Sequence, residues 1–293
     1  MHPILTVLAA CYGAVAGVFV PRAVYRLAVE PEQQWRAACP EGHPITGPAG
    51  GWLGLARCAV PAHTAPAGLP DAHPDGTSPA ATVSTDPTDP TGPNAPTGPG
   101  TSAARDRPRG VHAYGPPAVI VALLTSLVCA MLSAAVGKRP ELAVWLLLAP
   151  VAVALALVDT AVKRLPDVLT LSLAAGAATL LGMAALLPDS AGSWVGALLG
   201  GCALGGVYGL LFLIHPSGMG FGDVKLALGL GTVLGWYGWA VLFTGTFAGF
   251  LLGAVYGVGL IVLRRAGRKT AVPFGPFMLT GALLGLLLGG FAS

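Results

Sequence analysis

Long apolar runs separated by short polar stretches dominate this chain. Most runs hold close to the ~20 residues that an α-helix needs to cross a bilayer. The pattern therefore predicts an all-α fold, a polytopic membrane helix bundle with about eight transmembrane helices. The run 224–237 is short and Gly-rich, so we expect this span to be tilted, thin or half-buried. The expected spans cover residues 4–20, 117–136, 141–158, 168–187, 193–214, 224–237, 239–263 and 272–291.

The stretches between the runs divide the chain into four regions. Residues 1–29 are expected to form the first transmembrane helix, and residues 30–63 a polar loop. Residues 64–115 are dominated by Pro, Thr, Gly, Asp, Ala and Ser, a composition that cannot bury a core, so we expect a disordered linker there. Residues 116–293 then form a membrane-embedded domain.

The composition excludes several classes of protein. Hydrophobic residues make up 54% and charged residues 10% of the chain, whereas a soluble domain carries about 25% charged residues. The net charge of +3, spread over sixteen Lys and Arg, offers no basic patch, so nucleic acid is not an expected partner. Five widely spaced cysteines, an odd number, argue against a disulfide framework.

The Lys and Arg residues are concentrated in alternate loops. One set of loops holds only Lys138 and Arg139, and the other set holds all the remaining basic residues. Because cytoplasmic loops carry the excess of Lys and Arg, we expect a multi-pass protein of the plasma membrane with both termini outside. Arg22 and Arg26 follow the first apolar run, opposite to the order in a secretory signal peptide, which predicts an uncleaved helix. The expected cytoplasmic parts are residues 21–116 and the loops near residues 163, 218 and 267.

Five acidic residues occur after residue 117, and three of them lie at the cytoplasmic ends of expected spans. Glu141 and Asp189 belong to short outer turns, where a solvated acid needs no special explanation. Asp159 ends one apolar run, Asp223 begins another, and Asp167 lies just beyond the first. An acid at membrane depth costs several kcal/mol unless it is paired or hydrated, so these three are candidates for function.

Asp159 and Asp223 can form a pair because both belong to the same membrane face. Two neighbouring carboxylates do not both ionise easily, so one of them stays protonated. The ionised member can take a proton from a bound water, while the protonated member polarises a peptide carbonyl. In addition, three glycines precede Asp223 in the run 218–225 (GMGFGDVK), and glycine permits both a positive φ and the close approach of a substrate strand.

Three segments resemble one known family. Residues 220–223 (GFGD) match the GxGD motif of membrane aspartyl proteases, and with their flanks they resemble the bacterial prepilin peptidases, also called type IV leader peptidases. Residues 158–170 (VDTAVKRLPDVLT) are similar to that family's ID-x5-LPD-x-LT block, and residues 273–277 (PFGPF) are a weaker third match. The resemblance covers the chain from about residue 117 to the end.

The resemblance implies an integral-membrane aspartic endopeptidase that cleaves leader peptides from type IV prepilin-like or pseudopilin-like proteins at the cytoplasmic membrane face. It places the catalytic pair on Asp159 and Asp223, with no cofactor or metal expected for the peptidase activity. Asp167 is interpreted as a helix-start acid that accepts backbone N–H groups. Lys225 either favours the ionised form of the pair or anchors its helix. The supporting residues are Gly220, Gly222, Lys225 and Asp167.

The polar loop departs from the family pattern at its cysteines. Many prepilin peptidases carry two CxxC pairs there, with a spacing that suits tetrahedral zinc, whereas this loop keeps only Cys39 and Cys58. A substitute Cys2His2 site with His43 and His63 is chemically conceivable, but isolated Cys and His residues usually ligate nothing, so zinc is not expected. S-adenosylmethionine is implied only if the family's second activity, N-methylation, is retained, and the lost cysteines argue against that.

Two other classes of function stay open. In a proton-coupled transporter, Asp159 and Asp223 would relay protons, although acids nearer the bilayer centre and repeated halves would then be expected. In a non-catalytic component of a pilus or secretion assembly, either Asp would tolerate replacement by Asn. In a peptidase, the apolar helix of the substrate would pack against small residues, for example Gly200, Gly201, Gly205 and Gly206.

Overall fold

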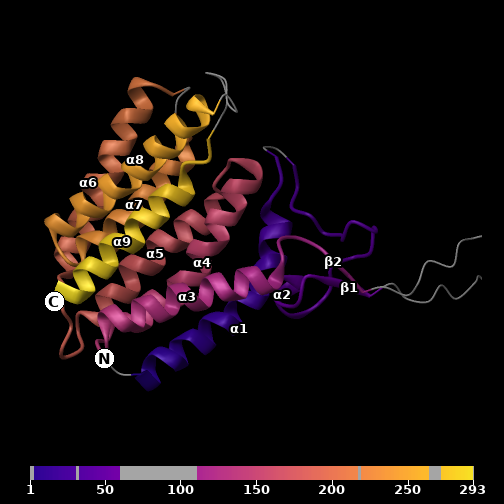
Figure 1. Cartoon of the computed structure of the whole chain (residues 1–293), viewed down its shortest axis with the longest axis horizontal. Helices are drawn as coiled ribbons and strands as arrows, with labels where there is room; N and C mark the ends of the chain where they lie inside the picture. The colour runs from indigo at the N-terminus through magenta and orange to yellow at the C-terminus, as the bar shows by residue number, and fades with distance from the viewer. Residues whose placement is uncertain (1–2, 31–32, 60–110, 217–218, 264–271, 293) are drawn as a thin grey trace, which may run out of the picture. The chain divides into compact units, whose positions relative to one another are not determined.

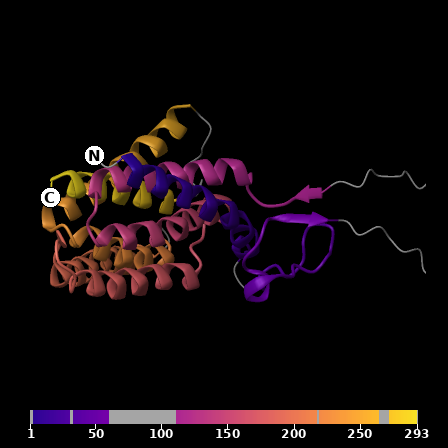
Figure 2. The ribbon, with the colours of Figure 1, turned by 90° about the horizontal axis from the view of Figure 1, so that it is seen from below.

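The computed structural model describes residues 3–30, 33–59, 111–216, 219–263 and 272–292. Within these ranges, long helices make up most of the chain and pack side by side (Figure 1 and Figure 2). The prediction of an all-α, polytopic helix bundle is therefore confirmed. The long helices are α1 (Pro3–Leu27), α3 (Ala118–Val136), α4 (Glu141–Val162), α5 (Asp167–Ala184), α6 (Trp194–Ile214), α7 (Phe221–Gly235), α8 (Trp239–Val262) and α9 (Gly275–Ala292).

Seven of these helices are long and apolar enough to cross a membrane, which is one fewer than the sequence predicts. The exception is α7, whose 15 residues rise by about 22 Å, less than the ~30 Å of a bilayer core. Ten of its residues are buried, and it packs against α5, α6, α8 and α9. The short Gly-rich run therefore forms an interior helix surrounded by other helices.

Glycines hold α6 and α7 close together. A Cβ atom added to Gly200 would lie 2.5 Å from the Gly231 carbonyl oxygen and 2.8 Å from the Gly235 Cα atom. Added Cβ atoms on Gly201 and Gly205 would likewise meet α7. We expected Gly200, Gly201, Gly205 and Gly206 to receive a substrate helix. The first three already face α7, whereas a Cβ atom on Gly206 would meet nothing within 4 Å. Small residues serve here to bring two helices of the same chain into backbone contact.

We expect Gly200→Val to destabilise the bundle by about 1–3 kcal/mol, since the added methyl groups meet backbone atoms that cannot rotate away. The matched control is Gly206→Val on the same helix, because a Cβ atom there meets nothing within 4 Å. Thermal unfolding in detergent, followed by circular dichroism, measures the difference. Equal melting temperatures for the two variants would contradict the packing described above.

The polar loop is attached to the cytoplasmic end expected for α1. The buried guanidinium of Arg22 donates hydrogen bonds to the carbonyl oxygens of Thr46 and Leu53, and Arg26 donates to the Gly50 carbonyl at 2.9 Å. These two arginines, which the sequence shows only as charges beside a span, therefore also hold the loop in place. The loop contains α2 (Pro48–Gly51) and β1 (Arg57–Ala59), and β1 pairs with β2 (Val111–Ala113) in a two-stranded sheet.

The chain divides into two units, Met1–Cys58 with Ala113–Ser293 as one and Ala59–His112 as the other. All the long helices belong to the first unit. The predicted disordered linker, residues 64–115, falls mainly on residues 60–110, which lie outside the described ranges. The proposed division into four regions stays a prediction.

Candidate active site

Asp159 is a buried acid in the last turn of α4. Its Oδ2 atom accepts a hydrogen bond from the backbone N–H of Gly275, the first residue of α9, at 2.9 Å. A Cβ atom on Gly275 would lie 2.8 Å from the same Oδ2 atom and 3.3 Å from Leu165 Cδ2. The carboxyl group is thus held by a backbone that only glycine allows to come so close.

The chain turns sharply after Asp159. Lys163 adopts a left-handed conformation with φ of 52°, and its N–H closes the helix on the Asp159 carbonyl oxygen at 2.7 Å. Pro166 cannot continue a helix, but it suits the position just before one. Consequently α5 begins at Asp167, and both acids of the 158–170 segment end up at the same end of the bundle.

Asp223 lies in the first turn of α7, where a carboxylate is favoured by the helix dipole. Its Oδ2 atom accepts a hydrogen bond from the N–H of Gly220, the residue that precedes the helix, at 3.2 Å. A Cβ atom on Gly222 would lie 2.9 Å from Leu165 Cβ, so this glycine permits α7 to approach the turn after α4.

The glycines of the GFGD segment do not use a positive φ. Gly220 has a φ of −75°, and Gly222 is an ordinary helical residue. Of the two properties that glycine permits, a positive φ is not used at these two positions, and Gly222 uses the close approach. Gly218, the first glycine of the run, lies outside the described residues.

One cavity of about 310 Å³ brings the predicted site residues together. Asp159 comes from α4 and Asp223 from α7, yet both line this cavity, as the sequence predicts for a pair. Basic and apolar residues surround them, so an acid pair is placed beside positive charge at a helix end. The lining residues are Asp159, Lys163, Arg164, Leu165, Asp167, Gly220, Phe221, Gly222, Asp223 and Lys225.

Lys225 and Asp167 form an ion pair at the rim of this cavity, with Nζ 2.6 Å from Oδ2. Asp167 is the first residue of α5, directly after Pro166, and its carboxylate makes this ion pair. The expectation that it accepts backbone N–H groups stays a prediction. Lys225 makes its ion pair with Asp167 and not with either acid of the pair, and its ammonium lies 4.8 Å above the Phe221 ring. The ion pair joins the start of α5 to the start of α7.

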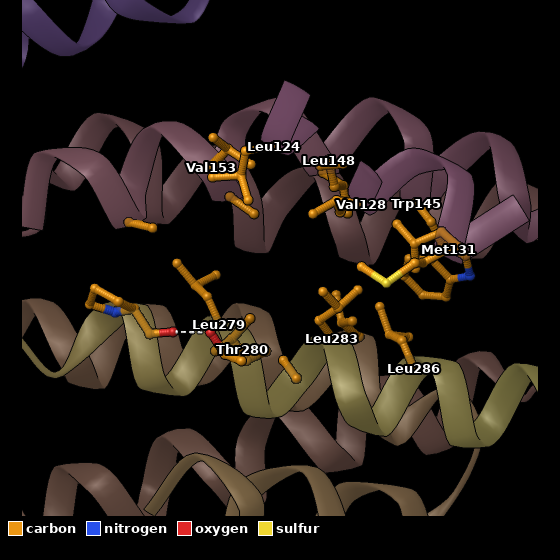
Figure 3. Close-up of a pocket in the computed structure, with 18 of the residues that line it drawn as sticks. Leu124, Val128, Met131, Trp145, Leu148, Val153, Leu279, Thr280, Leu283 and Leu286 are labelled. Carbon is orange, nitrogen blue, oxygen red and sulfur yellow. Dashed lines mark hydrogen bonds between the residues drawn. The ribbon is translucent and has the colours of Figure 1, made fainter. Parts of the chain in front are cut away.

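An apolar groove adjoins the acid cavity. It has a volume of about 450 Å³ and lies between α3 and α4 on one side and α9 on the other, with side chains from both sides facing one another (Figure 3). Along α4 it extends from Trp145 to Thr160, which is the residue after Asp159. On α9 it begins at Pro276, the residue after Gly275. One end of the groove therefore lies at the Asp159–Gly275 contact.

Two cysteines and a histidine of the polar loop also converge. Cys39 Sγ lies 3.2 Å from Cys58 Sγ, and His43 Nδ1 lies 3.2 Å from Cys58 Sγ and 3.7 Å from Cys39 Sγ. Burial acts to raise the pKa of Cys39, but hydrogen bonds with Cys58 and with the His43 backbone outweigh it and lower that pKa to about 7. His63, the other expected donor, lies outside the described residues.

Comparison with known proteins shows what the membrane domain is similar to. Residues 146–258, which contain both Asp159 and Asp223, match the model of the type IV leader peptidase family. This part of the chain is similar to the type IV leader peptidase family. The resemblance stated from the 158–170 and 220–223 segments is confirmed. No solved structure matches the chain.

Curated relatives carry the same family name. The chain is 35% identical over 173 residues to the prepilin leader peptidase/N-methyltransferase of Aeromonas salmonicida, which covers 58% of this chain and 57% of that protein. It is 34% identical over 173 residues to the enzyme of that name from Pseudomonas aeruginosa, with 58% of each covered. The match to the Bacillus subtilis protein is 36% over 111 residues, covering 36% of this chain and 42% of that protein. The chain thus spans little more than half the length of its first two relatives.

The type IV leader peptidase match ends before Gly275, although this residue holds Asp159. The sequence offered only the weak PFGPF match as a signal for it. The catalytic roles of Asp159 and Asp223 stay predictions, now with a shared cavity to support them.

Proposed function

We propose that this chain is an integral-membrane aspartic endopeptidase that cleaves leader peptides from type IV prepilin-like or pseudopilin-like proteins. The observation that carries the proposal is that Asp159 and Asp223, from two helices distant in sequence, line one cavity at the helix ends. The family match covers both acids and supports this class of substrate. The match alone would not assign the chemistry, and the two acids at one cavity support an acid-pair mechanism.

The chemistry needs one proton shared between the two carboxyl groups. The ionised carboxylate takes a proton from water as the water oxygen attacks the peptide carbonyl carbon, and the protonated carboxyl donates to the carbonyl oxygen. Collapse of the tetrahedral intermediate breaks the C–N bond, and the leaving amine receives a proton from the acid that was the base. The pair supplies both the proton acceptor and the proton donor, so no cofactor takes part in this scheme.

We place the active site at the cytoplasmic face of the plasma membrane. Lys163, Arg164 and Lys225 line the same cavity as the two acids. Since Lys and Arg accumulate on the cytoplasmic side of membrane proteins, the acid cavity belongs to that side. The leader peptides of the proposed substrates are basic and lie in the cytoplasm before cleavage, where the site would meet them.

The proposal is tested by incubating membranes that contain the full chain with a prepilin-like protein from the same organism. We expect a shortened product whose new N-terminus, determined by mass spectrometry, directly precedes the apolar helix of the substrate. A methyl group on that N-terminus would add an S-adenosylmethionine-dependent activity, against our expectation. An uncut substrate would favour the proton-coupled transporter or the non-catalytic assembly component.

The groove described above has the position needed for the apolar helix of such a substrate. It follows α4 from Trp145 to Thr160, about 22 Å, and ends beside Asp159. A helix lying there would deliver the residues at its end to the acid cavity. This surface replaces the glycine face of α6, which α7 covers.

Filling the groove is expected to weaken cleavage of a full-length substrate. Ala152 lines the groove seven residues before Asp159, so Ala152→Phe would narrow it without touching the acid pair. Loss of ~1.4 kcal/mol of docking energy corresponds to about a tenfold lower kcat/KM. Ala254→Phe on the exposed part of α8 is the matched control. Equal kcat/KM values for the two variants would show that the substrate helix does not bind in the groove.

A further inference from the structure

We propose that a pocket beside the acid cavity binds one side chain of the leader peptide, on the N-terminal side of the bond that is cut. This inference rests on the proposed function and deepens it, because it adds a subsite to which the polar loop contributes. The pocket has a volume of about 220 Å³ and lies between the end of α1, the polar loop and the turn from α4 to α5. We call it the leader pocket, and its lining residues are Leu27, Val29, Gln33, Trp35, Val158, Val162, Arg164, Pro166, Asp167 and Val168.

Three consecutive residues near the end of α4 line three different spaces. Val158 lines the leader pocket, Asp159 the acid cavity and Thr160 the apolar groove. Successive residues of an α-helix point about 100° apart, so the leader pocket and the groove lie on nearly opposite sides of α4, with Asp159 between them. A substrate whose apolar helix occupies the groove therefore passes Asp159 before it reaches the leader pocket.

The leader pocket is continuous with the acid cavity. Arg164 and Asp167 line both spaces, and the ion pair with Lys225 holds Asp167 at this shared edge. A peptide strand that lies across the acid pair can therefore place a side chain in the leader pocket. Since the groove receives the part of the substrate that follows the cut, the leader pocket receives the part that precedes it.

The lining suits a long side chain with an apolar stem. Val158 is fully buried and belongs to the same apolar cluster as Leu27, so the floor of the pocket is apolar. Trp35 adds an aromatic wall, and Gln33 adds an amide that can bind a polar end. The volume is below the ~300–1,000 Å³ of sites for drug-sized ligands, so the pocket has room for one side chain and not for a longer segment.

Contacts with α1 fix the part of the polar loop that forms this wall. Trp35 meets Trp52 edge to face, with ring centroids 5.3 Å apart, and the guanidinium of Arg26 lies 4.1 Å above the Trp52 ring. The Arg36 N–H donates a hydrogen bond to the Arg26 carbonyl oxygen at 3.2 Å. The pocket therefore has a preformed wall, which lowers the entropy cost of binding a side chain.

The inference is tested with prepilin-like substrates that carry either Met or Ala at each of the four positions before the cut. Side chains of an extended strand alternate in direction, so we expect one position to use the leader pocket and its immediate neighbours not to. At that position, membranes with the wild-type chain are expected to cleave the Met substrate with a kcat/KM about tenfold above that of the Ala substrate.

Filling the pocket is expected to remove this preference for Met. Val162→Phe should bring the two kcat/KM values within about twofold of each other, because the Ala substrate makes no use of the pocket. Trp35→Ala, which removes the aromatic wall, should lower the preference as well. The matched control is Val255→Phe on the exposed part of α8, which is expected to keep the preference of the wild type. Since the preference is a ratio measured on one preparation, it does not depend on how much of a variant folds.

Photo-crosslinking gives a measurement that does not require cleavage. A substrate with benzoylphenylalanine at the selected leader position is bound to the full-length Asp223→Asn variant, irradiated and digested. We expect the label on peptides that contain Trp35 or Val162. A second substrate, with the same probe in its apolar helix, is expected to label residues of the groove.

Several results would overturn the leader pocket and leave the proposed peptidase in place. They are a wild type without a Met preference at any position, a Val162→Phe variant that keeps the preference, and a leader probe that labels other peptides while the helix probe labels the groove. If the wild type cleaves no substrate and neither probe labels the chain, the proposed function fails and the leader pocket fails with it.

Discussion

Replacing Asp159 or Asp223 by Asn is expected to lower the rate of leader-peptide cleavage by about 10²–10⁴-fold or more. Asn keeps the size of the side chain but can neither take a proton from water nor give one to the leaving amine. The two acids line one cavity, and we propose that they act as a unit, so the double variant should be no slower than either single variant. The measurement is the initial rate of product formation from a prepilin-like substrate in membranes.

Asp189→Asn is the matched control for these variants. Asp189 lies between α5 and α6 with a φ of 63°, a conformation that Asn tolerates, and it does not line the acid cavity. The Asp189→Asn variant is expected to cleave the substrate at the same rate as the wild type. If Asp159→Asn and Asp223→Asn also cleave like the wild type, the acid pair is not the catalyst and the non-catalytic assembly component becomes the better hypothesis.

Gly275→Ala is expected to slow cleavage by about 10–100-fold although Gly275 carries no side chain. The added methyl group would lie 2.8 Å from Asp159 Oδ2, so the carboxyl group must move and its hydrogen bond from the Gly275 N–H is lost. A displacement of about 1 Å at a reacting group can change a rate by 10²-fold. The measurement is kcat at saturating substrate, because the substitution is expected to change the position of Asp159 and not the binding of the substrate.

Gly259→Ala on α8 controls for the general effect of adding a methyl group, because a Cβ atom there meets nothing within 4 Å. Its kcat should equal that of the wild type. Thermal unfolding of both variants in detergent separates an effect on the site from loss of the fold. A Gly275→Ala variant with normal kcat would show that the Gly275 N–H does not position Asp159.

The membrane-spanning helices and the candidate catalytic acids could be predicted from the sequence because polar groups are costly to place in a bilayer. Apolar runs marked the long helices, and the rarity of acids singled out Asp159 and Asp223, which indeed share a cavity. Periodicity did not reveal that α7 is an interior helix. Lipid and protein are equally apolar surroundings, so an apolar residue looks the same whichever of them it faces.

Other features depend on contacts between segments that the sequence keeps far apart. Lys225 was next to the acid in the chain, yet its partner is Asp167 at the start of another helix. Cys39 and Cys58 looked isolated because each lacks a cysteine nearby in sequence, whereas the loop folds them together. Gly275 acts through its backbone N–H, a group that every non-proline residue has and that no pattern of side chains can single out.

The hydrogen bond from the Tyr114 N–H to the Ala56 carbonyl oxygen, at 3.0 Å, has a consequence for the length of the chain. The first unit of the chain is interrupted between Cys58 and Ala113, and this bond holds together the two places where the interruption starts and stops. Each doubling in length of a flexible insertion between closed ends costs only about 0.6 kcal/mol. We therefore expect that the number of residues between Cys58 and Ala113 can be changed while the helices keep their packing.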